Sequence, residues 1–383
     1  MTRPVPLSVS APHRGGLLDL LRFAASAFIV LYHFGPNAPL PLDELSGVMG
    51  RGWLATDFFL LLSGYVLGRA YGRGLDDGRT TSSGFVARRL ARVWPGQAVV
   101  LIGFVALLAA TAAIGLGPSN PERFGAADFF AQLGLAQAWG VSRQAGWNEP
   151  SWTLSALIVC YAAFPFVWRG TEVLNGRAAA LAAGLAVLAG GGLLSLAVLQ
   201  QSLYDLPFYL GVFRAAPLFL AGLLAARFAA GGRIGRPAAF GLLVSATGLL
   251  VCVQADGRSE LAAFVSMMAI ATIVLASDAL RLGGSRLIEG AARLSFALFI
   301  THALAGAVWF GLLQQVHARY VLEPALEWAA WGGALVFALI VAWAFHRLID
   351  APVQAWLKAR LDGVPPARMQ WALRRHRERP HEA

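Results

Sequence analysis

The sequence predicts an all-α polytopic membrane protein, a bundle of about ten transmembrane helices with both termini in the cytoplasm. The first observation is composition: 57% of the 383 residues are hydrophobic and only 14% are charged, whereas soluble domains carry about 25% charged residues. The second is that apolar runs of about 20 residues, the length that a helix needs to cross a bilayer, recur along the chain. The third is an uneven distribution of arginine and lysine between the segments that join these runs.

The expected transmembrane helices follow the apolar runs in chain order. They are 17–34, 53–70, 93–116, 151–168, 178–199, 211–229, 237–254, 260–276, 291–313 and 328–346, with ends placed to within several residues. They form one domain, 17–357, between a Pro-rich lead, 1–16, and a basic tail, 358–383. The long connection 117–150 contains an amphipathic stretch, AADFFAQLGLAQAW, that we expect to lie along the membrane surface.

Positive charge fixes the expected orientation, because cytoplasmic segments carry an excess of arginine and lysine. If the N-terminus is cytoplasmic, the cytoplasmic segments hold 24 of the 31 basic residues and the outer segments hold 5. The net charge of +10 therefore mostly reflects topology, and lipid headgroups explain the tail RRHRERPHEA better than nucleic acid does. Cys160 and Cys252 both fall within expected helices, so we expect no disulfide framework.

The first apolar run, LLDLLRFAASAFIVLYHF, carries Asp19, Arg22 and His33. We do not expect it to be a removed signal peptide, because Asp19 and Arg22 lie inside it and no small-residue cleavage site follows. Ionisable groups inside a membrane span are expensive and usually functional. Residues eleven apart on a helix differ by about 20° in direction and by about 16 Å along the axis, so Arg22 and His33 share one face at different depths.

The second run, WLATDFFLLLSGYVL, places Asp57 at a depth similar to that of His33, because the chain re-enters the membrane from the outside. A carboxylate beside an imidazole fixes its tautomer and stabilises the imidazolium, as in many acyl-transfer sites. We therefore predict that His33 and Asp57 form a base and its orienting partner. The alternative is that His33 only caps a helix and that Asp57 pairs with a structural arginine.

Two further features are weaker on their own. Arg89 and Arg92, in ARRLARVWP, share a helical face and suit bidentate binding of phosphate, yet arginine at a cytoplasmic helix end is also an ordinary topology signal. His302 lies near the middle of the ninth run with Ser295 on the same face. It either faces a substrate or only forms a hydrogen bond between helices.

Six motifs in order resemble the signatures of the acyltransferase 3 family: LDLLRFAASAFIVLYHF, DFFLLLSGYVL, RRLARVWP, PSWTLSALIVCYAAFP, LSFALFITHA and RLIDAPV. Together they cover roughly residues 17–357. Members of this family are integral membrane enzymes that acylate hydroxyl groups, commonly on cell-surface sugars, lipids or small glycosylated products. We accordingly expect a multi-pass acyltransferase of the inner (cytoplasmic) membrane.

The resemblance carries over to single residues. The family's Arg-x10-His signature matches Arg22 and His33, its Arg-x-x-Arg signature matches Arg89 and Arg92, and its later motif ending in histidine matches His302. Its acidic residue, aromatic pair and Ser-Gly match Asp57, Phe58, Phe59, Ser63 and Gly64. The tenth-span Glu-x-Pro ending is here Asp350, Ala351 and Pro352.

The fourth motif departs from the family pattern. Many members read Trp-Ser-Leu-Ser-x-Glu, but this chain runs from Trp152 to Leu157, with leucine in place of the acid. If that acid contacts the acceptor in typical members, the resemblance implies a different acceptor for this chain.

The expected reaction moves an acyl group, acetyl by default, from acyl-CoA to a hydroxyl of a surface glycan, glycolipid or small glycosylated metabolite. We expect Arg22, Arg89 and Arg92 to bind the donor phosphates, and His33 with Asp57 to be catalytic; His302, Ser63 and Trp152 are candidate substrate-site residues. No metal, nucleic acid or cofactor beyond acyl-CoA as co-substrate is expected. An acyl-histidine intermediate is the competing route. The competing functions are a transporter or flippase, which predicts paired repeats and broken helices, and a non-catalytic membrane protein.

The predicted topology can be tested with reporter fusions. Fusions after residue 80 and at the C-terminus should both report the cytoplasm, because the basic segments that carry them are retained on that side. A periplasmic signal from either fusion would contradict the orientation.

Overall fold

Ten long helices dominate the computed structural model, which describes residues 16–361 apart from 119, 145 and 256–258. They are α1 (Leu17–Phe34), α3 (Trp53–Asp76), α4 (Ser82–Ala113), α6 (Trp152–Gly170), α7 (Gly176–Leu194), α8 (Gly211–Ala230), α9 (Arg236–Ala255), α10 (Glu260–Leu280), α11 (Arg286–His317) and α12 (Pro324–Phe345). Short α-helices are α2 (Leu42–Leu45), α5 (Ala126–Leu133) and α13 (Ala351–Leu361). No strand occurs in the part of the chain that the structure describes.

Single helical turns lie between or extend these helices. They are η1 (Gly35–Asn37), η2 (Met49–Arg51), η3 (Pro121–Phe124), η4 (Gln137–Val141), η5 (Glu149–Ser151), η6 (Thr171–Val173), η7 (Ser195–Leu199), η8 (Leu203–Asp205), η9 (Phe208–Leu210) and η10 (His346–Asp350).

The all-α polytopic class is confirmed, since nine described helices are long and apolar enough to cross a membrane. Each expected run corresponds to one long helix, but α3 is not among the nine. Its apolar character is diluted by Asp57, Arg69 and a series of glycines. The largest difference in bounds is at α4, which begins at Ser82, so that Pro95 lies inside the helix.

The expected lead 1–16 and basic tail 358–383 remain predictions. Residues 1–15 and 362–383 lie outside the described residues, and the expected end of the membrane domain at 357 falls inside α13. The amphipathic stretch of the long outer connection forms α5 and η4. The side of the membrane on which the termini lie stays a prediction.

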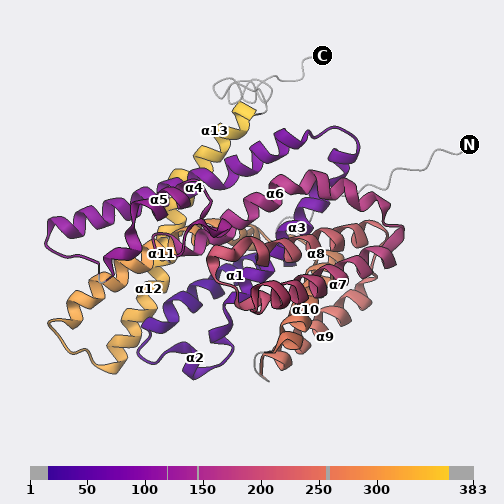
Figure 1. The fold of residues 1–383 in the computed structure, drawn as a ribbon. Helices are drawn as coiled ribbons and strands as arrows, with labels where there is room; N and C mark the ends of the chain where they lie inside the picture. Colours follow the sequence, from indigo (N-terminus) through magenta and orange to yellow (C-terminus); the bar gives the residue numbers. More distant parts are fainter. Residues whose placement is uncertain (1–15, 119, 145, 256–258, 362–383) are drawn as a thin grey trace, which may run out of the picture.

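Two hydrophobic clusters form the interior. One is built mainly from α3, α6, α8 and α10, and the other mainly from α1, α4, α11 and α12. Figure 1 shows α1 among these elements, with α11 and α12 on one side and α7 to α10 on the other. Side chains of α1, α3, α4, α6 and α11 meet at the seam between the clusters, where they line a cavity.

Glycine brings α3 and α8 into backbone contact. A Cβ added to Gly64 would overlap the carbonyl oxygen of Phe219, and one added to Gly222 would overlap that of Leu61. In a bilayer, small residues allow helices to approach closely and gain van der Waals contact. This packing keeps α3 in the interior of the bundle even though the helix is less apolar than its neighbours.

Candidate active site

The cavity at the seam has a volume of about 200 Å³ and gathers the three predicted donor-binding residues, Arg22, Arg89 and Arg92. We call it the arginine cavity. Its other wall is largely apolar, with Phe59, Leu62, Val66, Leu67, Val93, Leu154, Leu157, Phe296 and Phe299. It therefore combines a cationic region with a surface suited to an uncharged chain.

Arg22 and Arg89 have neighbours that leave donor groups available. Arg22 lies 3.4 Å from Asp19, one turn earlier on α1, and keeps a partly exposed side chain. An Nη2 of Arg89 donates to the hydroxyl of Tyr71 at 2.9 Å. The buried Nε of Arg89 has no hydrogen-bond partner, which is an unfavourable state for a buried donor and is relieved when an anion binds.

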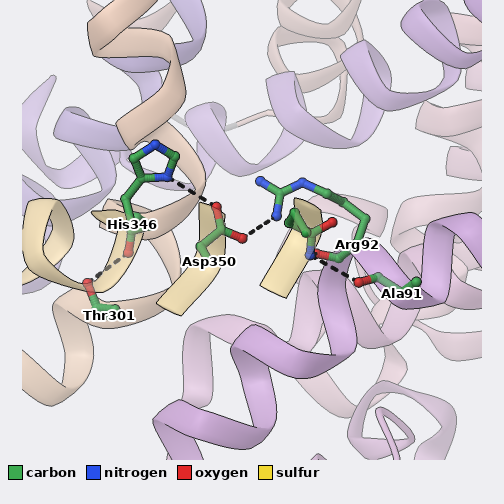
Figure 2. Close-up of polar contacts among 7 residues, drawn as sticks. Ala91, Arg92, Thr301, His346 and Asp350 are labelled. Atoms are coloured by element: carbon green, nitrogen blue, oxygen red, sulfur yellow. Dashed lines mark hydrogen bonds and ion pairs between the residues drawn. The ribbon is translucent and has the colours of Figure 1, made fainter. Parts of the chain in front are cut away.

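Arg92 is held by a carboxylate from the far end of the chain. Its Nη1 lies 2.6 Å from Oδ1 of Asp350, and Figure 2 shows the two side chains pointing toward each other. Oδ2 of Asp350 contacts Nδ1 of His346 at 3.2 Å. The guanidinium also lies 4.3 Å from the ring centre of Phe296. These contacts fix Arg92 at the cavity wall and offset part of its charge.

A second, larger cavity of about 790 Å³ lies at the other end of α1 and is lined by His33. We call it the histidine cavity. Its walls come from the end of α1, the turn η1, η2, the connections around Arg123 and Trp147, and the second half of α11. The side chain of His33 is exposed on this wall. Arg22 and His33 thus face different cavities, separated by eleven residues of one continuous helix.

The predicted residues His33 and His302 form a pair. Nδ1 of His33 lies 3.0 Å from Nε2 of His302, and His302 is fully buried. Nδ1 of His302 contacts the carbonyl oxygens of Phe299 at 2.8 Å and Leu298 at 3.2 Å. A carbonyl oxygen only accepts, so this Nδ1 carries the hydrogen.

The pair therefore fixes one tautomer. In a neutral ring whose Nδ1 carries the hydrogen, Nε2 holds a lone pair and accepts. His33 must then donate from its own Nδ1 to His302, which leaves Nε2 of His33 without a hydrogen. A histidine in this state is ready to act as a base.

Helices α1 and α11 run together from one cavity to the other. The hydroxyl of Ser26 on α1 donates to the carbonyl oxygen of Ser295 on α11 at 3.1 Å. Phe299 lines the arginine cavity, and its ring centre lies 6.2 Å from that of His302. Phe299 thus lies both at the arginine cavity and beside His302.

A family model described as an acyltransferase domain matches residues 17–347, nearly the whole chain. The chain belongs to the acyltransferase 3 family. The family indicates a membrane acyltransferase, and the two cavities are the candidate places for its substrates.

One relative found by sequence comparison is "Protein 2 in picA locus" of Rhizobium radiobacter, 38% identical over 93 residues. The match covers 23% of this chain and 43% of that protein's length. No solved structure matches the chain.

Asp57 does not partner His33, contrary to the sequence prediction. It forms a bidentate ion pair with Arg214, with Nε to Oδ1 at 2.8 Å and Nη2 to Oδ2 at 2.9 Å. Asp57 is 0% exposed and the side chain of Arg214 is 7% exposed. The acid was expected to face the imidazole because the two share a similar depth, but the buried guanidinium on α8 satisfies both carboxylate oxygens. Asp57 therefore pairs with a structural arginine, which was the alternative that the sequence left open.

The candidate substrate-site residues are divided between different surroundings. Ser63 lines the arginine cavity and donates to the carbonyl oxygen of Phe59 one turn earlier. Trp152 lies beside Arg214, whose guanidinium carbon is 6.0 Å from its ring centre, and is not among the residues that line either cavity. Leu157, where many members have glutamate, forms part of the apolar wall of the arginine cavity.

Sequence reasoning missed two partners within this site. It considered His302 without connecting it to His33, and Asp350 without connecting it to Arg92. The signal for the first was that His33, in the first expected span, and His302, in the ninth, lie at similar depths in the membrane. The signal for the second was an acidic residue at the end of the tenth run, on the same side as the basic start of α4.

Among the described residues, no group of three or more His, Cys, Asp or Glu side chains is arranged to hold a metal.

The ion pair predicts a stability effect for Asp57. Asp57→Ala leaves the buried Arg214 without its counter-charge and should destabilise the protein by about 3–5 kcal/mol. The double variant Asp57→Ala with Arg214→Met should recover much of this loss, since neither charge then remains buried alone. Thermal unfolding of the purified protein in detergent measures both. If Asp57→Ala unfolds like the wild type and loses only activity, Asp57 is a catalytic partner after all.

Proposed function

We propose that this acyltransferase moves an acyl group, acetyl by default, from acyl-CoA to a hydroxyl of a surface glycan, glycolipid or small glycosylated metabolite. The observation that carries the proposal is the placement of three arginines in one cavity and His33 in another, at the two ends of α1. A donor with phosphates at one end and a thioester at the other suits this arrangement.

The donor binds, in this proposal, from the arginine cavity. Arginine binds phosphate oxygens through paired, charge-assisted hydrogen bonds. Arg22, Arg89 and Arg92 supply such donors, and the positive-inside rule assigns this end of the bundle to the cytoplasm, where acyl-CoA is made. The rise of about 16 Å along eleven helical residues is comparable to the reach of the pantetheine arm.

The apolar wall of the arginine cavity then guides the uncharged arm and acyl group. Leu154 and Leu157 contribute to this wall, and Phe299 closes it next to His302. Leucine at 157, where a glutamate would offer a polar contact, keeps this wall apolar toward the acyl group.

The acceptor approaches through the histidine cavity, whose volume of about 790 Å³ suits a sugar or a glycosylated group. Nε2 of His33 takes the proton of the acceptor hydroxyl while its oxygen attacks the thioester carbonyl carbon. The carbon–sulfur bond breaks, and the thiolate of CoA leaves and takes a proton from the imidazolium. His302 keeps His33 in the tautomer that can accept, the role that the sequence had suggested for Asp57.

Removal of the Arg89 side chain should weaken the binding of acyl-CoA. We expect Arg89→Ala to reduce acyl-CoA affinity by about 1.5–3 kcal/mol, the value of a hydrogen bond to a charged group. Isothermal titration of purified protein with acyl-CoA measures the change. The matched control is Arg79→Ala, because Arg79 is exposed, pairs with Asp77 and lies outside the cavity. Equal affinities in both variants would reduce Arg89 to a topology signal.

The function itself is tested by following labelled acetyl-CoA into membrane glycans, lipids and secreted metabolites. The wild type should produce a labelled ester that His33→Ala fails to form while still binding acyl-CoA. His302→Phe should lower the maximal rate by about 10²-fold with little change in donor affinity, since general-base catalysis contributes about 10²–10⁴-fold. His302→Gln, whose amide oxygen can accept from His33, should recover part of the rate.

Two results would contradict this function. Full transfer by His33→Ala would remove the site, and stoichiometric label on His33 that passes to product would replace direct attack by an acyl-histidine route.

A further inference from the structure

A third cavity, of about 240 Å³, lies where the end of α3 meets the α8–α9 connection and the end of α10. Four arginines line it, and we call it the basic cavity: Arg69, Arg233, Arg236 and Arg281. The acidic side chain among its lining residues is Asp278. Four positive charges against one negative charge leave a site that favours an anion.

The inner wall of the basic cavity consists of buried polar side chains that bind one another, but one buried donor has no hydrogen-bond partner. Oδ2 of Asp278 accepts from the hydroxyl of Tyr65 at 2.6 Å and lies 3.3 Å from Nη2 of Arg69. The side chain of Arg69 is only 8% exposed, and its buried Nε has no hydrogen-bond partner. A buried donor without a partner costs free energy that a bound acceptor would return.

The outer wall supplies exposed charge. Arg236, at the start of α9, donates to the carbonyl oxygens of Leu280 at 3.2 Å and Arg281 at 3.4 Å, which joins the ends of two helices. Arg233 and Arg281 are exposed, and no carboxylate among the described residues forms an ion pair with either. Their guanidinium groups are therefore available to a ligand.

The basic cavity is separate from the arginine cavity. On α3, Ser63, Val66 and Leu67 face the arginine cavity, whereas Tyr65 and Arg69 face the basic cavity. Ligand binding at the basic cavity is therefore independent of the proposed reaction.

Large apolar side chains stand exposed beside the basic cavity. Phe240, one turn after Arg236 on α9, is 62% exposed, and Leu282, which follows Arg281, is 47% exposed. Both follow arginines at a helix end, the level at which the polar headgroups of a bilayer meet the acyl chains. A ligand with a phosphate and adjoining hydrocarbon satisfies both surfaces, whereas a free phosphate satisfies only the arginines.

We propose that the basic cavity binds the phosphate of an anionic phospholipid, with the acyl chains against Phe240 and the neighbouring face of α9. The arginines recognise the phosphate, and their excess charge favours an anionic headgroup over a zwitterionic one. A soluble phosphate is the other source of the same chemistry.

Native mass spectrometry of the full-length protein in detergent tests this site. The probes are short-chain phosphatidylglycerol, phosphatidylcholine of equal chain length, and inorganic phosphate. The wild type should retain phosphatidylglycerol in preference to phosphatidylcholine. The double variant Arg233→Gln with Arg281→Gln should bind phosphatidylglycerol about 30-fold more weakly, since each basic residue near a membrane surface contributes about fivefold.

The same measurement includes a control variant, Arg79→Gln. Arg79→Gln removes an exposed arginine elsewhere on the molecule and should leave lipid binding unchanged. Should the double variant fold poorly, each single variant is expected to show about fivefold weakening. Equal binding by wild type and either cavity variant overturns the site. Displacement of phosphatidylglycerol by millimolar inorganic phosphate overturns the lipid assignment in favour of a soluble anion.

Discussion

The hydrogen bond between His33 and His302 is the interaction on which the account of the site depends. The backbone carbonyls of Phe299 and Leu298 force the hydrogen of His302 onto Nδ1, and this in turn leaves Nε2 of His33 unprotonated toward the larger cavity. In the proposed reaction, a neutral imidazole thereby orients the base as a carboxylate does in many hydrolases, without adding a negative charge beside it. Inside a membrane bundle that substitution avoids a large desolvation cost.

The geometry of the histidine pair depends on how the helices that carry it are packed. The hydroxyl of Ser26 on α1 donates to the backbone of α11, and Trp331 of α12 donates to the carbonyl oxygen of Phe34, the residue that follows His33. In the hydrophobic cluster of α3, α6, α8 and α10, the glycine contact between α3 and α8 and the ion pair between Asp57 and Arg214 join the helices.

Much of the fold could be predicted from hydropathy, because a span needs about 20 apolar residues whatever it packs against. The ten expected runs each match one helix, and Arg22, Arg89 and Arg92 indeed share a cavity. Partners across helices could not be predicted, since depth alone does not fix which faces meet. Asp57 illustrates this: the sequence suggested the imidazole of His33 as its partner, but in the structure its carboxylate pairs with the guanidinium of Arg214 on α8. Asp350, the last residue of η10, likewise pairs with Arg92 of α4, a partner 258 residues earlier in the chain.

The most direct test of the two-cavity account is the structure of the protein with a non-hydrolysable thioether analogue of acetyl-CoA, determined by electron cryo-microscopy. We expect phosphate density among Arg22, Arg89 and Arg92, and the acyl carbonyl carbon beside His33 with space for an acceptor hydroxyl between them, and Phe299 displaced along the path. Phosphates bound outside the arginine cavity, or an acyl group that ends away from the histidine pair, would contradict it.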